Sequence, residues 1–421
     1  MLNDEKRSVP LVKASPRILL YGHDTFGLGH YRRNLSIASE LAHHLPQASV
    51  LCLTGSPCSD RFPKPPRFDS VRLPSATKDR HGNYASLSLE LTIDELIRLR
   101  RDLIETSVRR FQPDLVLVDH SPIGMGGELL GALEYLRKEM PSTPVILGLR
   151  DIIDDEESVI QTFQKDDIYR VVENYYDNVF VYGMESVYDP GVRYRFPASV
   201  RRKMQFMGYL YRNGVVSPED RSKLAPQTGR LVVVTVGGGA DGENVIRAFL
   251  QALASSTGRG RFDSVIVTGP LMAPETRAEL EASALQDSLP VRFVTFSRNV
   301  LDLFAAANVV VSMGGYNTLC EVLALGKKSV VIPRTSPRRE QLIRARRFEE
   351  LGLVDCLDPR DLEPGSLLAA VDKALIESES PGASSNGAVA LDFGGLSRVS
   401  RELSAALQYN LGAACGHRGS R

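Results

Sequence analysis

The stretch Asn308–Ile332, NVVVSMGGYNTLCEVLALGKKSVVI, contains the pattern of a strand, a turn, a helix and a second strand. Its first apolar run, Asn308–Val311, is short and nearly continuous, which is typical of a parallel strand covered on both faces. A serine and two glycines follow, and a helix is expected to begin near Tyr316–Asn317. The next apolar run, Ser329–Ile332, predicts the neighbouring strand. This order predicts a parallel sheet with a right-handed crossover.

Short apolar runs of the same kind recur before this stretch and alternate with helical patterns. They are Arg17–Gly22, Ser49–Leu53, Leu115–Val118, Pro144–Gly148 and Val179–Tyr182 in the first half, and Leu231–Val236, Ser264–Thr268 and Val291–Val294 in the second. Each half is long enough for a core of its own. The fold class that we predict is α/β, with two Rossmann-like domains facing each other across a cleft.

Changes in composition place the domain boundaries. The segment from residue 209 to 230 is polar and contains Pro and Gly, which is typical of a linker. We predict a flexible tail (1–16), a first Rossmann-like domain (17–208), the linker (209–230), a second Rossmann-like domain (231–377), a flexible connection (378–395), a terminal helix (396–408) and a final tail (409–421).

Charge and composition argue against several classes of protein. Of the 421 residues, 51 are Lys or Arg and 51 are Asp or Glu, a balance that argues against a general nucleic-acid-binding surface. The five cysteines lack metal-ligand spacing and fit reduced thiols. No apolar run reaches the roughly 18–20 residues that cross a bilayer, and no secretory signal is visible. We expect a cytoplasmic protein that can touch the inner face of the membrane.

The turn after the first quoted strand has the composition of an anion site at a helix N-terminus. The backbone amides of Gly314 and Gly315 can face an anion there. The hydroxyls of Ser312 and Thr318 can face the same point. Glu321 lies one turn into the helix, where a carboxylate can accept hydrogen bonds from ribose hydroxyls.

The loop after the second quoted strand is rich in arginine. Residues 333–347, PRTSPRREQLIRARR, contain six arginines. Because the loop follows a strand, it lies at the same edge of the sheet, where Arg334 and Arg338 can neutralise a diphosphate. Glu340 and Gln341 can form hydrogen bonds with sugar hydroxyls.

A second glycine-rich turn opens the second half. Gly237, Gly238 and Gly239 follow a continuous apolar strand, so their amides can approach a phosphate. The pattern is not the GxGxxG fingerprint, which argues against NAD and FAD, and no Gly-Lys-Ser/Thr follows, which argues against ATP hydrolysis. No Asp-x-Asp motif is apparent, and we expect neither a metal ion nor a cofactor.

The first strand is followed by the sequence GHDTFGLGH. Gly27 and Gly29 allow backbone amides to approach an anion. His30 lies in the first turn of the next helix, where it can take a proton from a hydroxyl at neutral pH. His23 could equally be the base, and Asp24 is the nearest carboxylate that could orient one.

Polar side chains also follow two other strands of the first half. Asp119 and His120 come after the third strand, and Arg150 follows the fourth. The carboxyl ends of parallel strands form the ligand-binding edge of such a sheet. These three residues are therefore candidate contacts to a second substrate, although a salt bridge or a cap at the sheet edge is an equal interpretation.

Residues Val291–Leu357 resemble the C-terminal donor domain of the GT-B glycosyltransferases of the MurG type, glycosyltransferase family 28. The shared order is a strand, Phe-x-x-x-hydrophobic, a helix, a strand, Ser-x-Gly-Gly-x-x-Thr, a Glu on the next helix, and a Pro loop that ends in a polar pair. The resemblance implies the following contacts: Phe296 and Val300 to the base; Gly314, Gly315, Asn317 and Thr318 to the diphosphate; Glu321 to the ribose; Glu340 and Gln341 to the sugar.

The resemblance extends to the triple glycine Gly237–Gly239 and to the N-terminal loop that ends at His30. It implies an inverting, metal-independent glycosyltransferase that uses a nucleotide-diphosphate sugar, with UDP favoured. The second domain would hold this donor. The first domain would bind a glycan, a lipid or a metabolite through a hydroxyl, with Gly27, Gly29, Asp119, His120 and Arg150 as candidate contacts.

Several alternatives stay open. The polar pair is Glu340-Gln341, where the family has Gln-Gln or Asp-Gln, and this difference leaves the sugar undetermined. The arginines in Arg334–Arg339 indicate an extra anionic contact or a different nucleotide. Nucleotide-sugar epimerases and hydrolases share the architecture, and Asp119, Asp151 and Glu340 could supply their carboxylates. A third class is a protein that binds a nucleotide sugar without turning it over.

Overall fold

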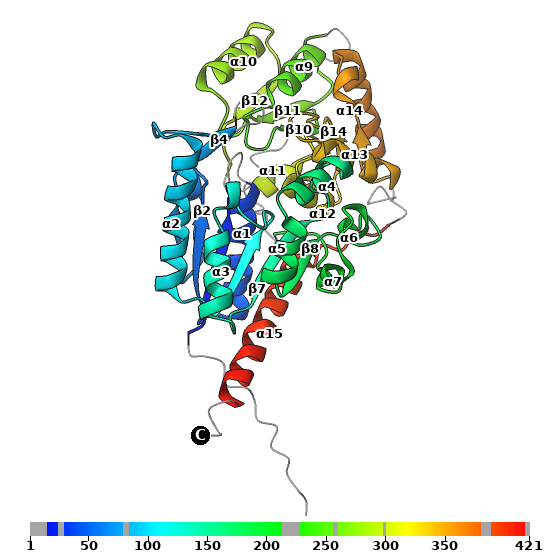
Figure 1. Ribbon diagram of the computed structural model, residues 1–421. Helices are drawn as coiled ribbons and strands as arrows, with labels where there is room; N and C mark the ends of the chain where they lie inside the picture. The colour runs from blue at the N-terminus through cyan, green and yellow to red at the C-terminus, as the bar shows by residue number, and fades with distance from the viewer. Residues whose placement is uncertain are drawn as a thin grey trace, which may run out of the picture.

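The computed structural model describes residues 15–23, 29–78, 84–212, 228–255, 260–297, 300–379 and 389–416. Two parallel sheets dominate it, one from each half of the chain, and helices cover the faces of both (Figure 1). The predicted α/β fold with two Rossmann-like domains is therefore confirmed. The division of the chain at the predicted domain boundaries stays a prediction.

The first sheet has seven strands in the order β3-β2-β1-β6-β7-β8-β9. Its strands are β1 (Arg17–Gly22), β2 (Ser49–Thr54), β3 (Phe68–Arg72), β6 (Leu115–Asp119), β7 (Val145–Arg150), β8 (Asn178–Tyr182) and β9 (Met204–Phe206). Each paired neighbour is parallel. A short antiparallel pair, β4 (Ala76–Lys78) and β5 (Tyr84–Ser86), lies outside this sheet.

The second sheet has six parallel strands in the order β12-β11-β10-β13-β14-β15. Its strands are β10 (Leu231–Thr235), β11 (Asp263–Val267), β12 (Val291–Val294), β13 (Val309–Ser312), β14 (Lys328–Val331) and β15 (Asp355–Cys356). Strand β10 is buried along its whole length, as its unbroken run of apolar residues predicts for a strand covered on both faces.

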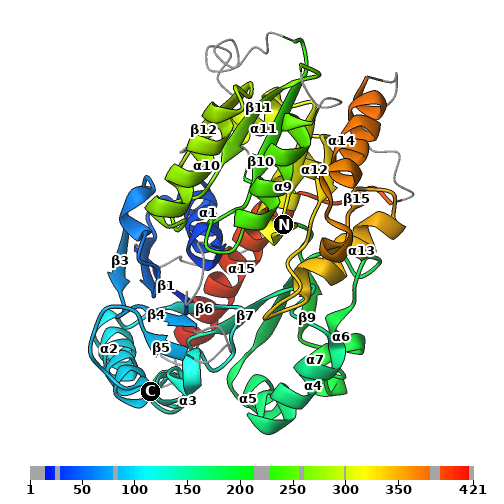
Figure 2. The same ribbon diagram turned by 90° about the horizontal axis from the view of Figure 1, so that it is seen from above.

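The helices complete the layers on both sides of each sheet (Figure 2). They are α1 (Gly29–His44), α2 (Ile93–Phe111), α3 (Leu130–Glu139), α4 (Glu156–Lys165), α5 (Ile168–Tyr175), α6 (Pro190–Arg193), α7 (Ala198–Arg201), α9 (Glu243–Ala254), α10 (Pro274–Gln286), α11 (Val300–Ala306), α12 (Tyr316–Ala324), α13 (Glu340–Glu350), α14 (Pro364–Ser378) and α15 (Gly395–Gly416). Three short 3-10 turns, η1 (Ser59–Arg61), η2 (Met125–Gly127) and η3 (Pro359–Asp361), lie between them. In the part of the chain that the structure describes, no helix is both long and apolar enough to cross a membrane.

The strand order reverses direction at one point in each sheet. In the first sheet this point lies between β1 and β6, and in the second it lies between β10 and β13. Neighbouring connections leave such a point on opposite sides of the sheet, so a crevice opens at the carboxyl ends of the two strands. The two crevices are therefore the expected binding sites of the two domains.

The last helix returns to the first half of the chain, where α15 packs against α1 (Figure 1). Two predicted segments lie in this part of the chain. Residues 391–394, predicted as part of a flexible connection, pair with the chain that leaves β9, since the Tyr209 amide donates to the Asp392 carbonyl. Helix α15 spans Gly395–Gly416, whereas the predicted terminal helix ends at residue 408, and its buried apolar stripe, Leu396 to Leu407, lies within the predicted range.

Both halves of the chain share one hydrophobic cluster. It includes Tyr31 from α1, Tyr316 and Leu319 from α12, and Val399 and Leu403 from α15. Helix α13 adds polar contacts, since Arg344 donates to the Ile152 carbonyl and Arg347 to the Val187 carbonyl. These contacts hold the two sheets with their carboxyl ends facing each other.

The position of α15 generates a first prediction. Leu403 is fully buried in the shared cluster, whereas Arg401 on the same helix is exposed. Leu403→Ala is expected to lower the free energy of unfolding by about 2–5 kcal/mol, because it removes buried methyl groups and leaves a cavity. Urea unfolding followed by circular dichroism measures this change, with Arg401→Ala as the matched control. Equal stabilities of the two variants would contradict the packing.

Candidate functional site

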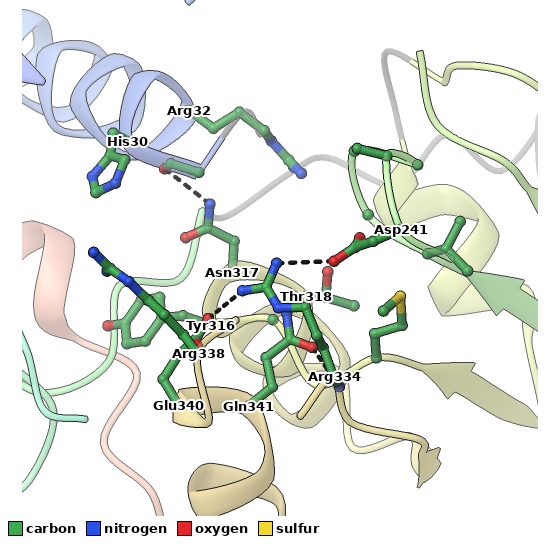
Figure 3. A pocket seen from close by; sticks show the side chains of 18 of the residues that line it. His30, Arg32, Asp241, Tyr316, Asn317, Thr318, Arg334, Arg338, Glu340 and Gln341 are labelled. Atoms are coloured by element: carbon green, nitrogen blue, oxygen red, sulfur yellow. Dashed lines mark hydrogen bonds and ion pairs between the residues drawn. The ribbon is translucent and has the colours of Figure 1, made fainter. Parts of the chain in front are cut away.

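A cavity of about 310 Å³ lies between the two domains at the carboxyl ends of their strands. Its walls come from the loop after β1, from the start of α1, and from the loops after β10, β13 and β14 (Figure 3). The predicted residues that line it are His23, Gly29, His30, Arg150, Gly237, Gly238, Gly239, Gly315, Asn317, Thr318, Arg334, Arg338, Glu340 and Gln341. Most of the candidate site predicted from the sequence is thus brought together in one place.

The N-terminus of α12 points its first backbone amides at this cavity. Gly314 has a φ of 76° and a Cβ there would lie 2.8 Å from the Val331 side chain, so the turn requires glycine. A Cβ on Gly315 would meet nothing within 4 Å, so the space above the helix start is open. Amides in the first turn of a helix have no partner within the helix. They and the helix dipole make this end of α12 a site for an anion.

Two predicted donor contacts lie elsewhere. Ser312 is fully buried, and its hydroxyl accepts a hydrogen bond from the Gly314 amide (3.4 Å), so it shapes the turn and does not line the cavity. Gly314 itself lies behind the cavity wall. Its neighbours Met313 and Gly315 line the cavity, whereas Gly314 faces the Val331 side chain.

The loop before α13 carries the polar pair and two arginines. Arg334 donates to Asp241 (2.9 Å) and to Glu340 (2.9 Å), and its amide donates to the side chain of Gln341 (3.0 Å). Burial alone would raise the pKa of Glu340, but Arg150 and the loop arginines together hold it below its usual range. Glu340 is therefore a carboxylate at neutral pH, able to accept hydrogen bonds from sugar hydroxyls.

A smaller second cavity adjoins the first beside Thr235, Gly237 and Thr318. Two predicted base contacts, Phe296 and Val300, line it, as does Phe62 from the first domain, whose ring meets that of Phe296 edge to face at 5.5 Å. An aromatic wall of this kind can pack against the face of a flat nucleobase.

Glu321 lies at the junction of the two cavities and is nearly buried. One of its carboxylate oxygens accepts a hydrogen bond from Arg32 of α1 at 2.7 Å. The other oxygen has no partner among the described residues. A buried carboxylate oxygen without a donor is costly, so this atom is free to accept a hydroxyl of a ligand.

The triple glycine turns tightly beside the same cavity. Gly237 and Gly239 have φ angles of 64° and 91°, and a Cβ on Gly239 would lie 2.1 Å from the Thr268 carbonyl. Only glycine fits there, because the chain passes directly against the loop after β11. The turn does not open a helix at once, since α9 begins at Glu243.

On the first-domain side, His30 is oriented by a buried carboxylate. Its Nδ1 lies 2.6 Å from Asp119 Oδ2, and Arg33 donates hydrogen bonds to both oxygens of the same carboxylate at 2.8 and 2.9 Å. Burial would raise the pKa of Asp119, but Arg33 and His30 hold it far below its usual range. An ionised carboxylate can only accept, so Nδ1 of His30 carries the proton. In the neutral form of the ring, Nε2 of His30 is the nitrogen without a proton and can act as a base.

Asp119 therefore has a different role from the predicted one. The sequence placed it among contacts to the acceptor, but its side chain is fully buried behind His30 and lies outside the cavity lining. The structure assigns it the orienting role that the sequence had given to Asp24. Asp24 and Gly27 lie outside the described residues.

Two further histidines surround His30. The ring of His23 lies 4.6 Å and that of His120 lies 5.4 Å from the His30 ring, measured between centroids. Burial, followed by neighbouring positive charges, lowers the pKa of both His23 and His120, so both are neutral at pH 7. Among the described residues, neither has a carboxylate partner like that of His30. His120, predicted to contact the acceptor, is buried and does not line the cavity.

Several contacts between site residues were not predicted from the sequence. Asp241 pairs with Arg334, Arg32 pairs with Glu321, and Asn317 donates to the Gly29 carbonyl at 3.2 Å. The last two contacts join the domains, and no sequence signal pairs residues so far apart. The pairing of Arg33 with Asp119 was equally hidden. Among the described residues, no three His, Cys, Asp or Glu side chains are arranged to hold a metal ion.

Comparison with known proteins agrees with this architecture. Residues 231–393 match the model of the glycosyltransferase family 28 C-terminal domain. A UDP-N-acetylglucosamine–N-acetylmuramyl-(pentapeptide) pyrophosphoryl-undecaprenol N-acetylglucosamine transferase from Lachnospira eligens is 39% identical over 85 residues, which are 20% of this chain and 24% of the relative. A Bacillus cereus protein of the same name is 24% identical over 281 residues, 65% of this chain and 68% of the relative.

Two solved structures share the fold over nearly the whole chain. The calicheamicin glycosyltransferase CalG4 has a TM-score of 0.54 at 16% identity and covers 96% of this chain and 97% of its own. The UDP-GlcNAc 2-epimerase from Methanocaldococcus jannaschii has a TM-score of 0.55 at 12% identity and covers 93% of this chain and 99% of its own.

The two facing sheets and the site between them define a protein of the GT-B class. Within that class, residues 231–393 match the glycosyltransferase family 28 C-terminal domain, and the chain resembles the MurG-like transferases in sequence. The resemblance predicted from Val291–Leu357 is thus confirmed.

The buried histidines generate a second prediction, on stability. Below pH about 6.5 the unfolded chain protonates His120 while the native state does not, so stability falls as the pH is lowered, by about 1.4 kcal/mol per pH unit for this one proton. His120→Asn removes the proton and keeps a residue that tolerates positive φ. The free energy of unfolding, measured with urea between pH 6.5 and 5, should therefore fall less steeply with falling pH in this variant. The difference in slope should correspond to one proton.

Exposed His43→Asn serves as the control for this measurement and should keep the slope of the unmodified protein. The other titrating groups are the same in the unmodified protein and in His120→Asn. The difference between their pH slopes of stability therefore reports His120 alone. An unchanged slope in His120→Asn would mean that His120 is protonated in the native state.

Proposed function

We propose that the protein transfers a sugar from a nucleotide-diphosphate sugar, with UDP favoured, to a hydroxyl acceptor, with inversion at the anomeric carbon and without a metal ion. The observation that carries the proposal is that an oriented base, His30, and an anion-binding helix start, α12, face each other across one cavity. The names of the sequence relatives favour an N-acetylhexosamine as the sugar.

The donor fits the second-domain side of the two joined cavities. The base would lie in the second cavity against Phe296 and Val300, and the ribose would meet the free carboxylate oxygen of Glu321. The diphosphate would then lie at the amides of the α12 N-terminus. Glu340 and Gln341 also line this cavity, and they would contact the sugar that is attached to the diphosphate.

The acceptor would approach from the first-domain side. Nε2 of His30 takes the proton of the acceptor hydroxyl, whose oxygen forms a bond to the anomeric carbon while the bond from that carbon to the diphosphate oxygen breaks. The electron pair of the broken bond stays on the leaving nucleoside diphosphate. The α12 amides and Arg334 stabilise that developing charge, and Asp119 stabilises the protonated imidazole. Attack opposite the leaving group gives inversion.

A second function is favoured by one comparison. A UDP-GlcNAc 2-epimerase shares the fold, and Asp241 and Glu340 supply carboxylates beside the sugar position. An epimerase or a hydrolase consumes the donor without an acceptor, whereas a transferase does not. Product analysis of UDP-N-acetylglucosamine incubated with the protein alone separates the two. Rapid stoichiometric conversion in the absence of acceptor would favour this second function.

The identity of the acceptor and its location belong to the same proposal. The names of the relatives contain a lipid-linked sugar, and a lipid-linked or glycan acceptor used at the inner face of the membrane fits the predicted cytoplasmic protein.

The donor site is tested by ligand-induced stabilisation. UDP is expected to raise the melting temperature, because a ligand that binds only the native state stabilises it by mass action. Glu321→Gln should weaken UDP binding by about 10–100-fold, since it removes a charged acceptor of a ribose hydrogen bond. Exposed Glu350→Gln on α13 is the control and should bind UDP as the unmodified protein does. No stabilisation by any nucleoside diphosphate would overturn the assignment.

The base is tested by separating turnover from binding. His30→Ala is expected to lower kcat on the order of 10²–10⁴-fold, because proton transfer from the acceptor loses its base. The Kd for UDP should stay within about twofold, since His30 lies on the acceptor side. Release of UDP from the donor, with an acceptor found by screening, measures kcat, and calorimetry measures Kd. Equal losses in both quantities would assign His30 to donor binding.

A further inference from the structure

Two arginines of the same loop point to different sides of the cavity. Arg334 turns toward the second domain, where Asp241 and Glu340 neutralise it. Arg338 extends toward His30 instead (Figure 3). Across the described ranges, no side chain forms a hydrogen bond or an ion pair with the Arg338 guanidinium. The site thus contains one cation that its own carboxylates do not pair.

The protein holds Arg338 in this position through its neighbour. The backbone amide of Arg339 donates to Asp154 Oδ1 of the first domain at 2.7 Å. The same oxygen also accepts a hydrogen bond from the backbone amide of Asp155. This backbone hydrogen bond connects the loop to the first domain across the cleft. It places Arg338 beside the first domain, and the Arg338 side chain takes no part in the bond.

A second cation, Arg150, lies on the opposite wall of the cavity. Arg150, at the end of β7, donates to Nε2 of His120 at 3.0 Å, and its Nε has no partner among the described residues. An arginine can only donate, so His120 accepts this bond as a neutral ring and does not neutralise the charge. Burial, followed by the nearby Arg33, lowers the pKa of Arg150 to about 9, although the charge of Glu340 opposes this shift.

We propose that Arg338 and Arg150 form a second anion site on the first-domain side of His30, which binds a phosphate or carboxylate group of the acceptor. This inference rests on the proposed transfer reaction and adds the chemical class of its second substrate. The two partly buried guanidinium groups form no hydrogen bond with a carboxylate among the described residues, and a bound oxyanion can accept hydrogen bonds from both.

The placement distinguishes this site from the one for the donor diphosphate. The donor side has its own cation, Arg334, and its own helix start, α12. Arg338 stands beside the histidines of the first domain, since it lowers the pKa of both His23 and His120. An anion held there fixes the acceptor next to Nε2 of His30, and such positioning speeds the reaction of a nearby hydroxyl.

Calorimetry with inorganic phosphate tests the site in the full chain saturated with UDP. The UDP-bound protein is expected to bind phosphate, and Arg338→Ala should weaken that binding at least about tenfold. Exposed Arg339→Ala, one residue further along the loop, is the matched control and should bind phosphate normally. Arg150→Met should also weaken it. No phosphate binding by the UDP complex, or equal binding in Arg338→Ala, would overturn the inference.

The same titration with UDP-N-acetylglucosamine in place of UDP locates the anion. Phosphate binding that is unchanged by the neutral sugar assigns the anion to the acceptor. Phosphate that is displaced by the sugar means that Arg338 and Arg150 recognise a charged group on the donor, which would overturn the acceptor assignment. Failure of the protein to bind UDP at all would instead reject the proposed function, so the two failures are distinguishable.

Discussion

The buried carboxylate of Asp119 is the constraint on which the site depends. It sits at the end of β6 with no exposure to solvent, and it stays ionised only because Arg33 and His30 approach it from the first two turns of α1. This pairing fixes the position of α1 against the sheet and the tautomer of His30 together. Arg33 also lies against the ring of Tyr316 at 5.5 Å, so the network reaches the start of α12.

The strand order explains why these groups meet. Asp119 and His30 follow β6 and β1, the two strands that flank the reversal point of the first sheet. The glycine turn after β10 and the α12 start after β13 flank the corresponding point of the second. Because the two sheets face each other by these ends, one crevice supplies a base and the other supplies an anion site. The division of chemistry between domains follows from topology.

Local patterns in the sequence were sufficient for the strands, the glycine turns and the donor loop. The runs such as Leu231–Val236 are continuous because both faces of the strand are buried, and Gly314 is required by the space beside Val331. Pairings between distant residues could not be predicted. Asp119 looked like a ligand contact because it ends a strand, and only the packing of α1 shows that His30 and Arg33 cover it.

The sequence also gave no sign of which side of the cleft each arginine faces. Arg334 and Arg338 are four residues apart in one loop, yet one is neutralised in the second domain and the other lies against the first. The direction of the loop is set by the bond from the Arg339 amide to Asp154, a contact between domains. Charge composition alone could indicate an additional anion but could not place it.

A crystal structure of the protein with UDP tests the central claim most directly. The account predicts the diphosphate at the amides of Tyr316–Thr318, the ribose against Glu321, and Nε2 of His30 open to the space beyond the β-phosphate. A diphosphate bound on the first-domain side, or one in direct contact with His30 Nε2, would contradict the assignment of donor and acceptor to the two domains.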